Sequence, residues 1–305
     1  MCWKIGTKKC PRLVESDQVS FSYRNNDCDR VNVRDRGTME FKIMTWVVKF
    51  LMFKRGLFHV WILIGSSLVS AEELTFDEQA ELMVAIQSAN YDVVIRLTDG
   101  LKDDNDWIRA RAGAFQRRGE ERFFDADIDG SIDDFDAFLK MMPKEDPHHW
   151  QRGLSYYYAG EYEKGKAQFE RHQNVNTQDV ENAVWHFLCS VRAPGGSLRL
   201  ARKRFIPIER DSRVPMKEVH DLFGGWGSIE AVLKAAQPRD SDNLSERERN
   251  HLCYAHLYLA LYFEAIGETE KMKKHIRLAA FDYAMEHYMG RTAQVHAKLR
   301  EVKED

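Results

Sequence analysis

The sequence predicts an all-α fold, an α-α solenoid of consecutive helix pairs closed by a C-terminal capping helix. Seven prolines in 305 residues, together with long runs of apolar residues at helical spacing, favour helices over strands. The clearest unit is residues 146–179, where Gly153 and Gly165 let two short amphipathic helices approach and Gly160 makes the turn between them. Two helices of this size do not bury a core alone, so we expect neighbouring copies of the unit.

A second copy of this unit lies 34 residues upstream, over residues 112–145. The positions that match in size or type across this interval are Gly119 with Gly153, Ala126 with Gly160, Ile128 with Tyr162, Ser131 with Gly165, and Phe135 with Phe169. Pro143 falls where the second helix of the copy is expected to end. These matches at one fixed interval indicate an internal repeat.

Weaker copies account for much of the remaining chain. We expect helix pairs over residues 74–104, 182–215 and 216–237, a further pair after the polar loop that follows, and a last helix over about 284–302. Three helix starts are marked by capping residues, namely Thr75 with Glu78, then Thr177 or Asp179, and then Asn243 or Ser245. The last helix ends in charged residues and is expected to cap the solenoid with a polar face.

The N-terminal region differs from the rest of the chain. Residues 1–51 show no sustained period and are expected to be a non-globular or mis-annotated extension, whereas 52–71 have the order of an export signal: basic residues, an apolar run, then small residues. We expect cleavage there, which leaves a helical domain of residues 72–305 in the periplasm or outside the cell. The alternative is an uncleaved membrane anchor, although the apolar segment 57–69 is shorter than the roughly 20 residues that span a bilayer.

Charge and cysteine content narrow the choice of partners. Residues 1–55 carry 12 basic and 6 acidic side chains, while the whole chain has a formal net charge of -3. The larger downstream part is therefore acidic, which argues against nucleic-acid binding.

In that part, Cys189 and Cys253 fall on apolar helix faces. We expect buried free thiols, with a disulfide as the alternative in an oxidising compartment.

One aspartate-rich stretch offers a second interpretation of the repeat at 112–145. It fits the loop of a calcium-binding EF-hand, with possible ligands Asp125, Asp127, Asp129, Asp133 and Asp136. The last position is an aspartate, one methylene shorter than the usual bidentate glutamate. The repeat pattern also places most of the stretch in a turn and a helix, where aspartates favour the helix start without a metal. We therefore expect no metal here and keep calcium binding as the alternative function.

The sequence contains no recognised catalytic constellation. The patterns GxSxG, HExxH and CxxC and the phosphate-binding loop are absent. The histidine pairs His148–His149 and His251–His256 do not make a metal site by themselves. We expect a protein that is not an enzyme and that needs no cofactor.

The repeat pattern resembles the tetratricopeptide repeat, and the chain resembles bacterial envelope tetratricopeptide proteins of the new-lipoprotein-I type. The likeness covers about residues 74–300 and is carried by RGLSYYYAGEY at 152–162, by YLALYFEAIG at 258–267 and by the preceding export signal. It implies a scaffold that holds cell-wall hydrolases and processing proteases on its concave face. No cysteine follows the export signal directly, so a lipid anchor is not implied.

The resemblance also implies which residues line the concave groove. In the first helices of the pairs these are Gln116, Glu120, Phe123, Trp150, Leu154, Tyr157, His186 and Ser190, with Leu257 and Glu264 in the last pair. The aromatic members are of the kind that anchors peptides. The alternative is that some of them pack against the C-terminal helices. A basic run, Arg199 with Arg202, Lys203 and Arg204, is interpreted as a solvated face, with a site for an acidic partner as the alternative. We expect an exported scaffold for protein or peptide partners, possible envelope enzymes among them.

Overall fold

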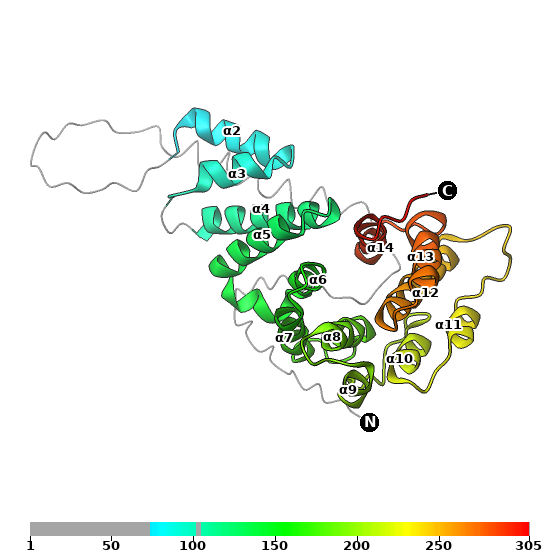
Figure 1. The fold of residues 1–305 in the computed structure, drawn as a ribbon. Coiled ribbons are helices and arrows are strands. Elements are labelled where there is room, and N and C mark those ends of the chain that lie inside the picture. The colour runs from blue at the N-terminus through cyan, green and yellow to red at the C-terminus, as the bar shows by residue number, and fades with distance from the viewer. Residues whose placement is uncertain (1–73, 102–104, 305) are drawn as a thin grey trace, which may run out of the picture. The chain divides into compact units, whose positions relative to one another are not determined.

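The computed structural model describes residues 74–101 and 105–304, which form helices joined by turns and loops, with no strand among them (Figure 1). The expected all-α class is therefore confirmed. The extension at 1–51 and the export segment at 52–71 lie outside the described residues. Within the described part, no helix combines the length and the apolar composition needed to cross a membrane.

The helices of the described residues are joined by turns and loops (Figure 1). In order they are α2 (Phe76–Gln87) and α3 (Tyr91–Thr98), α4 (Asn105–Phe124) and α5 (Ile128–Met141), the 3-10 helix η1 (Pro143–His148), α6 (Trp150–Tyr158) and α7 (Tyr162–Gln173), α8 (Val180–Arg192) and α9 (Leu198–Lys203), α10 (Met216–Gly224) and α11 (Ile229–Ala235), α12 (Glu246–Ala265) and α13 (Thr269–Arg277), the π-helix η2 (Leu278–Asp282), and α14 (Tyr288–Leu299). The last helix is shorter than the expected 284–302 because η2 and a turn precede it.

The predicted helix boundaries are set by caps. Thr75 and Glu78 form a capping box at the start of α2, and Ser245 forms another with Glu248 at the start of α12. Of the two candidates before α8, the cap is Asp179, whose carboxylate accepts a hydrogen bond from the backbone N–H of Glu181. The turn between α6 and α7 has Gly160 at φ +78°, a left-handed conformation that costs glycine little.

The internal repeat is visible as equivalent contacts 34 residues apart. A Cβ atom added to Gly119 would lie 2.7 Å from the ring of Phe135, and one added to Gly153 would lie 2.7 Å from the ring of Phe169. In α4–α5 and in α6–α7, a glycine therefore lets the phenylalanine of the second helix rest on the backbone of the first. Both phenylalanine rings are fully buried.

Polar contacts repeat at the same interval. The residues before the two glycines are arginines that reach the second helix of the pair: Arg118 Nε donates to Asp134 Oδ2 at 2.9 Å, and Arg152 Nε donates to Gln168 Oε1 at 3.1 Å. Contacts between successive pairs also recur. Ser131 lies 2.8 Å from Ser155 through their hydroxyl oxygens, and a Cβ at the equivalent Gly165 would lie 2.9 Å from Cys189 Sγ, again 34 residues on.

Within the described residues, the hydrophobic core has two parts. A small cluster joins α2 and α3 to α4 through Leu82, Ala85, Val94, Leu97 and Ala114. The main cluster extends from α4 to α14 and includes both cysteines of the described part, Cys189 and Cys253. They are buried free thiols, as expected, and burial raises the pKa of each above its usual range. The disulfide alternative is wrong.

The fourth pair departs from the expected repeat over 182–215. Its second helix, α9, ends at Lys203, and residues 204–215 form no helix apart from the turn into α10. Two prolines in this segment disfavour the helical backbone at the residues that precede them. The segment is instead held by Arg213, whose guanidinium contacts carboxylates of Asp179 and Asp211 at 2.7 and 2.6 Å.

Candidate functional site

The predicted groove is occupied by the chain's own C-terminal helices. We call the faces of α4, α6 and α8 that contact α12 and α14 the inner side. There the ring of Phe123 stacks on that of Tyr288, with centroids 5.9 Å apart, and Tyr157 Oη donates to Glu264 Oε2 at 2.6 Å. Phe123, Leu154 and Tyr157 are fully buried. The expectation that these three side chains line an open groove is therefore wrong, and they belong to the core against the C-terminal helices.

Three predicted groove residues remain partly exposed at the edge of the inner side. Gln116 Nε2 donates to Glu120 Oε1 at 2.9 Å, and the ring of Trp150 meets Tyr288 edge-on at 4.7 Å. We call Gln116, Glu120 and Trp150 the inner-side edge. The edge thus carries an amide and a carboxylate on α4 and an indole on α6, the mixture of polar and apolar groups with which a peptide is bound.

The last two predicted residues lie on another face. His186 Nε2 is 3.3 Å from Glu170 Oε1 of α7, away from the inner side. His186 lines a hollow of about 310 Å³ on this face. The other lining residues are Lys166, Glu170, Gln173, Asn174, Arg204 and Ile206. Ser190 follows one turn later on α8, where its hydroxyl donates to the carbonyl of His186.

The sequence assignment missed two residues of α8 that do reach the inner side. Trp185 meets Tyr157 edge-on at 5.3 Å between ring centroids, and Arg192 lies 3.4 Å from Glu264. The assigned His186 and Ser190 lie two residues beyond the positions 34 residues after Trp150 and Leu154, and two residues turn the assigned face by about 200° around a helix. The helical neighbours of the buried Cys189 were the available signal, because Trp185 precedes it by one turn.

A buried ionic cluster fixes α14 to this side of the molecule. Glu264 of α12 accepts hydrogen bonds from Tyr157 and, at 2.6 Å, from Arg300 Nε. Burial opposes ionisation of Glu264, but the neighbouring His296, Arg300 and Arg192, with the bond from Tyr157, hold the pKa of this carboxyl below its usual value. His296 of α14 is fully buried beside it, and burial lowers the pKa of its imidazole to about 4.

The aspartate-rich stretch does not form a calcium loop. Asp127 is the N-cap of α5, so Asp129, Asp133 and Asp136 lie on a helix and cannot converge with Asp125 on one ion. Asp136 instead accepts a hydrogen bond from an arginine of α6 at 2.7 Å. Among the described residues no three side chains of the metal-binding types come close enough to hold an ion. The interpretation as a helix start is the one that fits.

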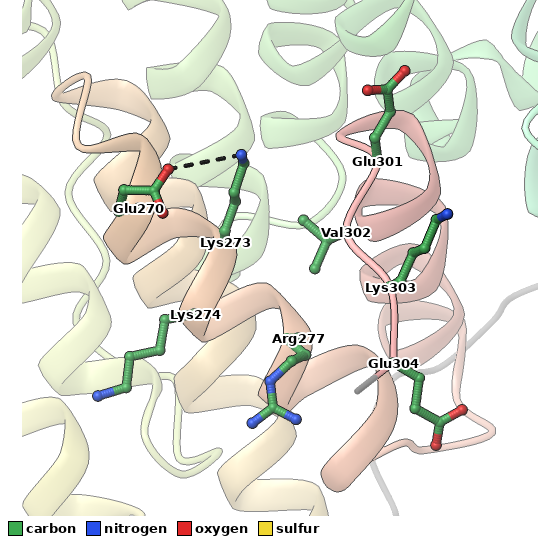
Figure 2. A pocket seen from close by; sticks show the side chains of 8 residues that line it. All are labelled: Glu270, Lys273, Lys274, Arg277, Glu301, Val302, Lys303 and Glu304. Atoms are coloured by element: carbon green, nitrogen blue, oxygen red, sulfur yellow. Dashed lines mark ion pairs between the residues drawn. The ribbon is translucent and has the colours of Figure 1, made fainter.

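A second hollow, of about 520 Å³, lies between α13 and the C-terminal tail (Figure 2). Its lining residues are Glu270, Lys273, Lys274, Arg277, Glu301, Val302, Lys303 and Glu304. Figure 2 shows Lys273 directed toward Glu270, with which it pairs at 3.7 Å, while Glu301 and Glu304 stand along the tail. Both signs of charge line this hollow, so its electrostatics select no class of ligand.

A buried histidine caps α6 and joins two repeats. The backbone N–H of Arg152 donates to His149 Nδ1 at 3.3 Å, which leaves the proton on Nε2, 2.6 Å from Gln116 Oε1. Burial, assisted by the charge of Arg152, lowers the pKa of His149 to about 3. Protonation would remove the acceptor that caps the helix.

Acidification is therefore expected to destabilise the protein through His149. The unfolded chain takes up a proton near the usual pKa of about 6.5 and the folded chain does not, so stability is complete above that pH. As pH falls toward 3, this histidine alone lowers the unfolding free energy by up to about 1.4 kcal/mol per pH unit. Urea unfolding of a His149→Asn variant, which keeps a cap acceptor, is expected to show a shallower pH dependence. The exposed neighbour gives the control, because His148→Asn should leave the dependence unchanged.

Comparison with models of known protein families gives no match, and no curated protein matches the sequence either.

Proposed function

We propose that the chain is an exported, non-enzymatic scaffold in which tetratricopeptide-like helix pairs form a solenoid that binds protein partners. The observation that carries the proposal is the recurrence of the same contacts at the 34-residue interval, with Gly119 on Phe135 and Gly153 on Phe169. Repeats of this kind extend one surface over several helix pairs, and such surfaces serve for binding. The expected export signal places the partners in the cell envelope, with envelope enzymes among the candidates.

The inner-side edge is the part of the predicted groove that a partner can reach. Trp150 is an indole held against Tyr288 yet partly exposed, and aromatic residues of this kind dominate binding energies at protein interfaces. Gln116 and Glu120 of α4 supply an amide and a carboxylate, which bind the backbone and cationic side chains of a peptide. Because the deeper aromatics are buried, we place the partner across this edge and not between α6 and α12.

Site-specific photo-cross-linking tests the proposal. A photoreactive residue replaces Gln116 in the full chain, produced in cells that make the protein, and Gln87 at the exposed end of α2 serves as the control position. We expect discrete cross-linked partner proteins from position 116 that are absent from position 87. The Trp150→Ala change should reduce their yield by about tenfold with unchanged helical circular dichroism, and Phe76→Ala, which truncates an exposed aromatic elsewhere, should not.

The cross-linked samples also show which results would contradict the proposal. Identical cross-links from positions 116 and 87, or a yield that Trp150→Ala leaves unchanged, would contradict binding at the inner-side edge. N-terminal sequencing of the purified protein reports on export, since cleavage after Ala71 is expected to give a chain that begins at Glu72.

A further inference from the structure

A stretch of sequence with several basic residues and no acidic residue includes α9. Residues 182–208 contain five basic and no acidic side chains, although the whole chain has a net charge of -3. Arg199, Lys203 and Arg204 are exposed, and in the described part of the chain no carboxylate pairs with them. By contrast, Arg213 contacts three carboxylates. The cations of α9 are therefore available to groups from outside this chain.

An exposed tryptophan lies in the glycine-rich turn between α10 and α11. Trp226 is 65% exposed, yet its indole is fixed: Nε1 donates to Asp221 Oδ1 at 2.8 Å, and the ring covers Gly224, where a Cβ would lie 2.2 Å from Cη2. The ring of His220 meets it edge-on at 5.9 Å. A large apolar side chain that is exposed and already ordered loses little conformational entropy when a partner covers it.

The two features are neighbours. Arg202 of α9 reaches the turn, since its Nε lies 3.4 Å from the carbonyl of Phe223 and 3.0 Å from where a Cβ on Gly225 would be. The ring of Phe205, just after α9, lies 6.5 Å from that of Trp226. We define the basic–tryptophan surface as Arg199, Leu200, Lys203, Arg204 and Trp226. Leu200 is 36% exposed and adds apolar area to it.

We propose that the basic–tryptophan surface binds an acidic segment of a partner protein that carries a large apolar side chain. Three unpaired cations match carboxylates, and the fixed indole of Trp226 matches the apolar side chain, so both parts of the ligand are covered at once. The proposal deepens the proposed function, because it rests on a scaffold role and adds the chemistry of one partner. It uses α9 and the α10–α11 turn, not the inner-side edge on α4 and α6.

Binding of a defined peptide tests this. The probe is a fluorescein-labelled peptide of twelve residues, glutamate and aspartate with a central Leu-Phe, titrated with the full chain at low salt and followed by anisotropy. We expect saturable binding that weakens as salt rises. A variant with Arg199→Gln, Lys203→Gln and Arg204→Gln should bind about tenfold more weakly or worse, and so should Trp226→Ala. Because these side chains are exposed, both variants should keep the melting temperature of the parent.

A matched variant controls for charge alone. Lys271→Gln, Lys273→Gln and Lys274→Gln remove the same number of charges from α13 and should leave the affinity within about twofold. Equal binding by all variants, or no saturable binding of the acidic peptide, would overturn the proposal. So would tighter binding of single-stranded oligothymidylate or of anionic phosphatidylglycerol vesicles, which would make the surface one for nucleic acid or membrane. Trp150→Ala should leave peptide binding intact, so loss of cross-linked partners in that variant reports on the proposed function separately.

Discussion

Replacing Phe169 by alanine is expected to lower the free energy of unfolding by about 3–5 kcal/mol, the range for deleting a buried phenylalanine side chain. The ring is 1% exposed and rests on the backbone of α6 at Gly153, so its loss leaves a cavity between the two helices of the pair. A domain is usually stable by only about 5–15 kcal/mol. Urea unfolding followed by circular dichroism measures the change. The equivalent Phe135→Ala change in α5 should give a loss of the same size.

A second substitution shows whether the ring and the glycine act together. Gly153→Ala adds a Cβ 2.7 Å from the ring of Phe169, and such overpacking costs about 1–3 kcal/mol, which exceeds the gain in helix propensity of about 1 kcal/mol. In a Phe169→Ala background the same change should be neutral or stabilising, since nothing then opposes the methyl group. Gly113 of α4 is the control, because nothing lies within 4 Å of its Cβ position and Gly113→Ala should stabilise the protein. Equal stabilisation by Gly113→Ala and Gly153→Ala would disprove the tight contact.

The features that depend on local sequence could be predicted. The 34-residue interval matches Gly119 with Gly153 and Phe135 with Phe169, and both glycines do lie against the phenylalanine of the following helix. Equivalent positions of a repeat are expected to make equivalent contacts. Helix starts such as the one capped by Ser245 were also predictable, because a capping side chain bonds to backbone groups within one turn of its own helix. The calcium pattern was misleading because a regular helix start and an ion-binding loop both use closely spaced aspartates.

The features that depend on long-range packing could not be predicted. Tyr158 contacts His296 across 138 residues and Lys298 reaches the carbonyl of Asp125 across 173 residues, and no spacing within a repeat encodes these contacts. The repeat pattern assigned Tyr157 and Glu264 to one face, and these two side chains do contact each other, but they are buried and line no open groove. What fills that face is the end of the same chain. An apolar inner side signals burial equally well whether a partner or the protein's own last helix covers it.

The contact between Glu264 and its neighbours is expected to carry much of the docking energy of α14. Glu264 forms ion pairs with both Arg192 and Arg300. Removing one partner of a buried ion pair costs about 3–5 kcal/mol of unfolding free energy. The side chains of Arg192 and Arg300 are 34% and 29% exposed, so water can solvate their charges in part when Glu264 is lost. We therefore expect Glu264→Gln to lower the unfolding free energy by about 3 kcal/mol, the lower end of that range.

A double-mutant cycle decides how this energy arises. Arg300→Gln added to Glu264→Gln should cost less than Arg300→Gln alone, because the cation that it removes has already lost its partner. Glu270→Gln in the neighbouring helix is the control, and its side chain, 89% exposed, should contribute less than about 1 kcal/mol. If the ion pair holds α14 in place, the backbone amides of α14, whose C-cap is Arg300, should exchange hydrogen faster in the Glu264→Gln variant before those of other helices do. If Glu264→Gln behaves like Glu270→Gln, α14 is docked by its apolar contacts alone, and the inner side is a core that needs no charge to close it.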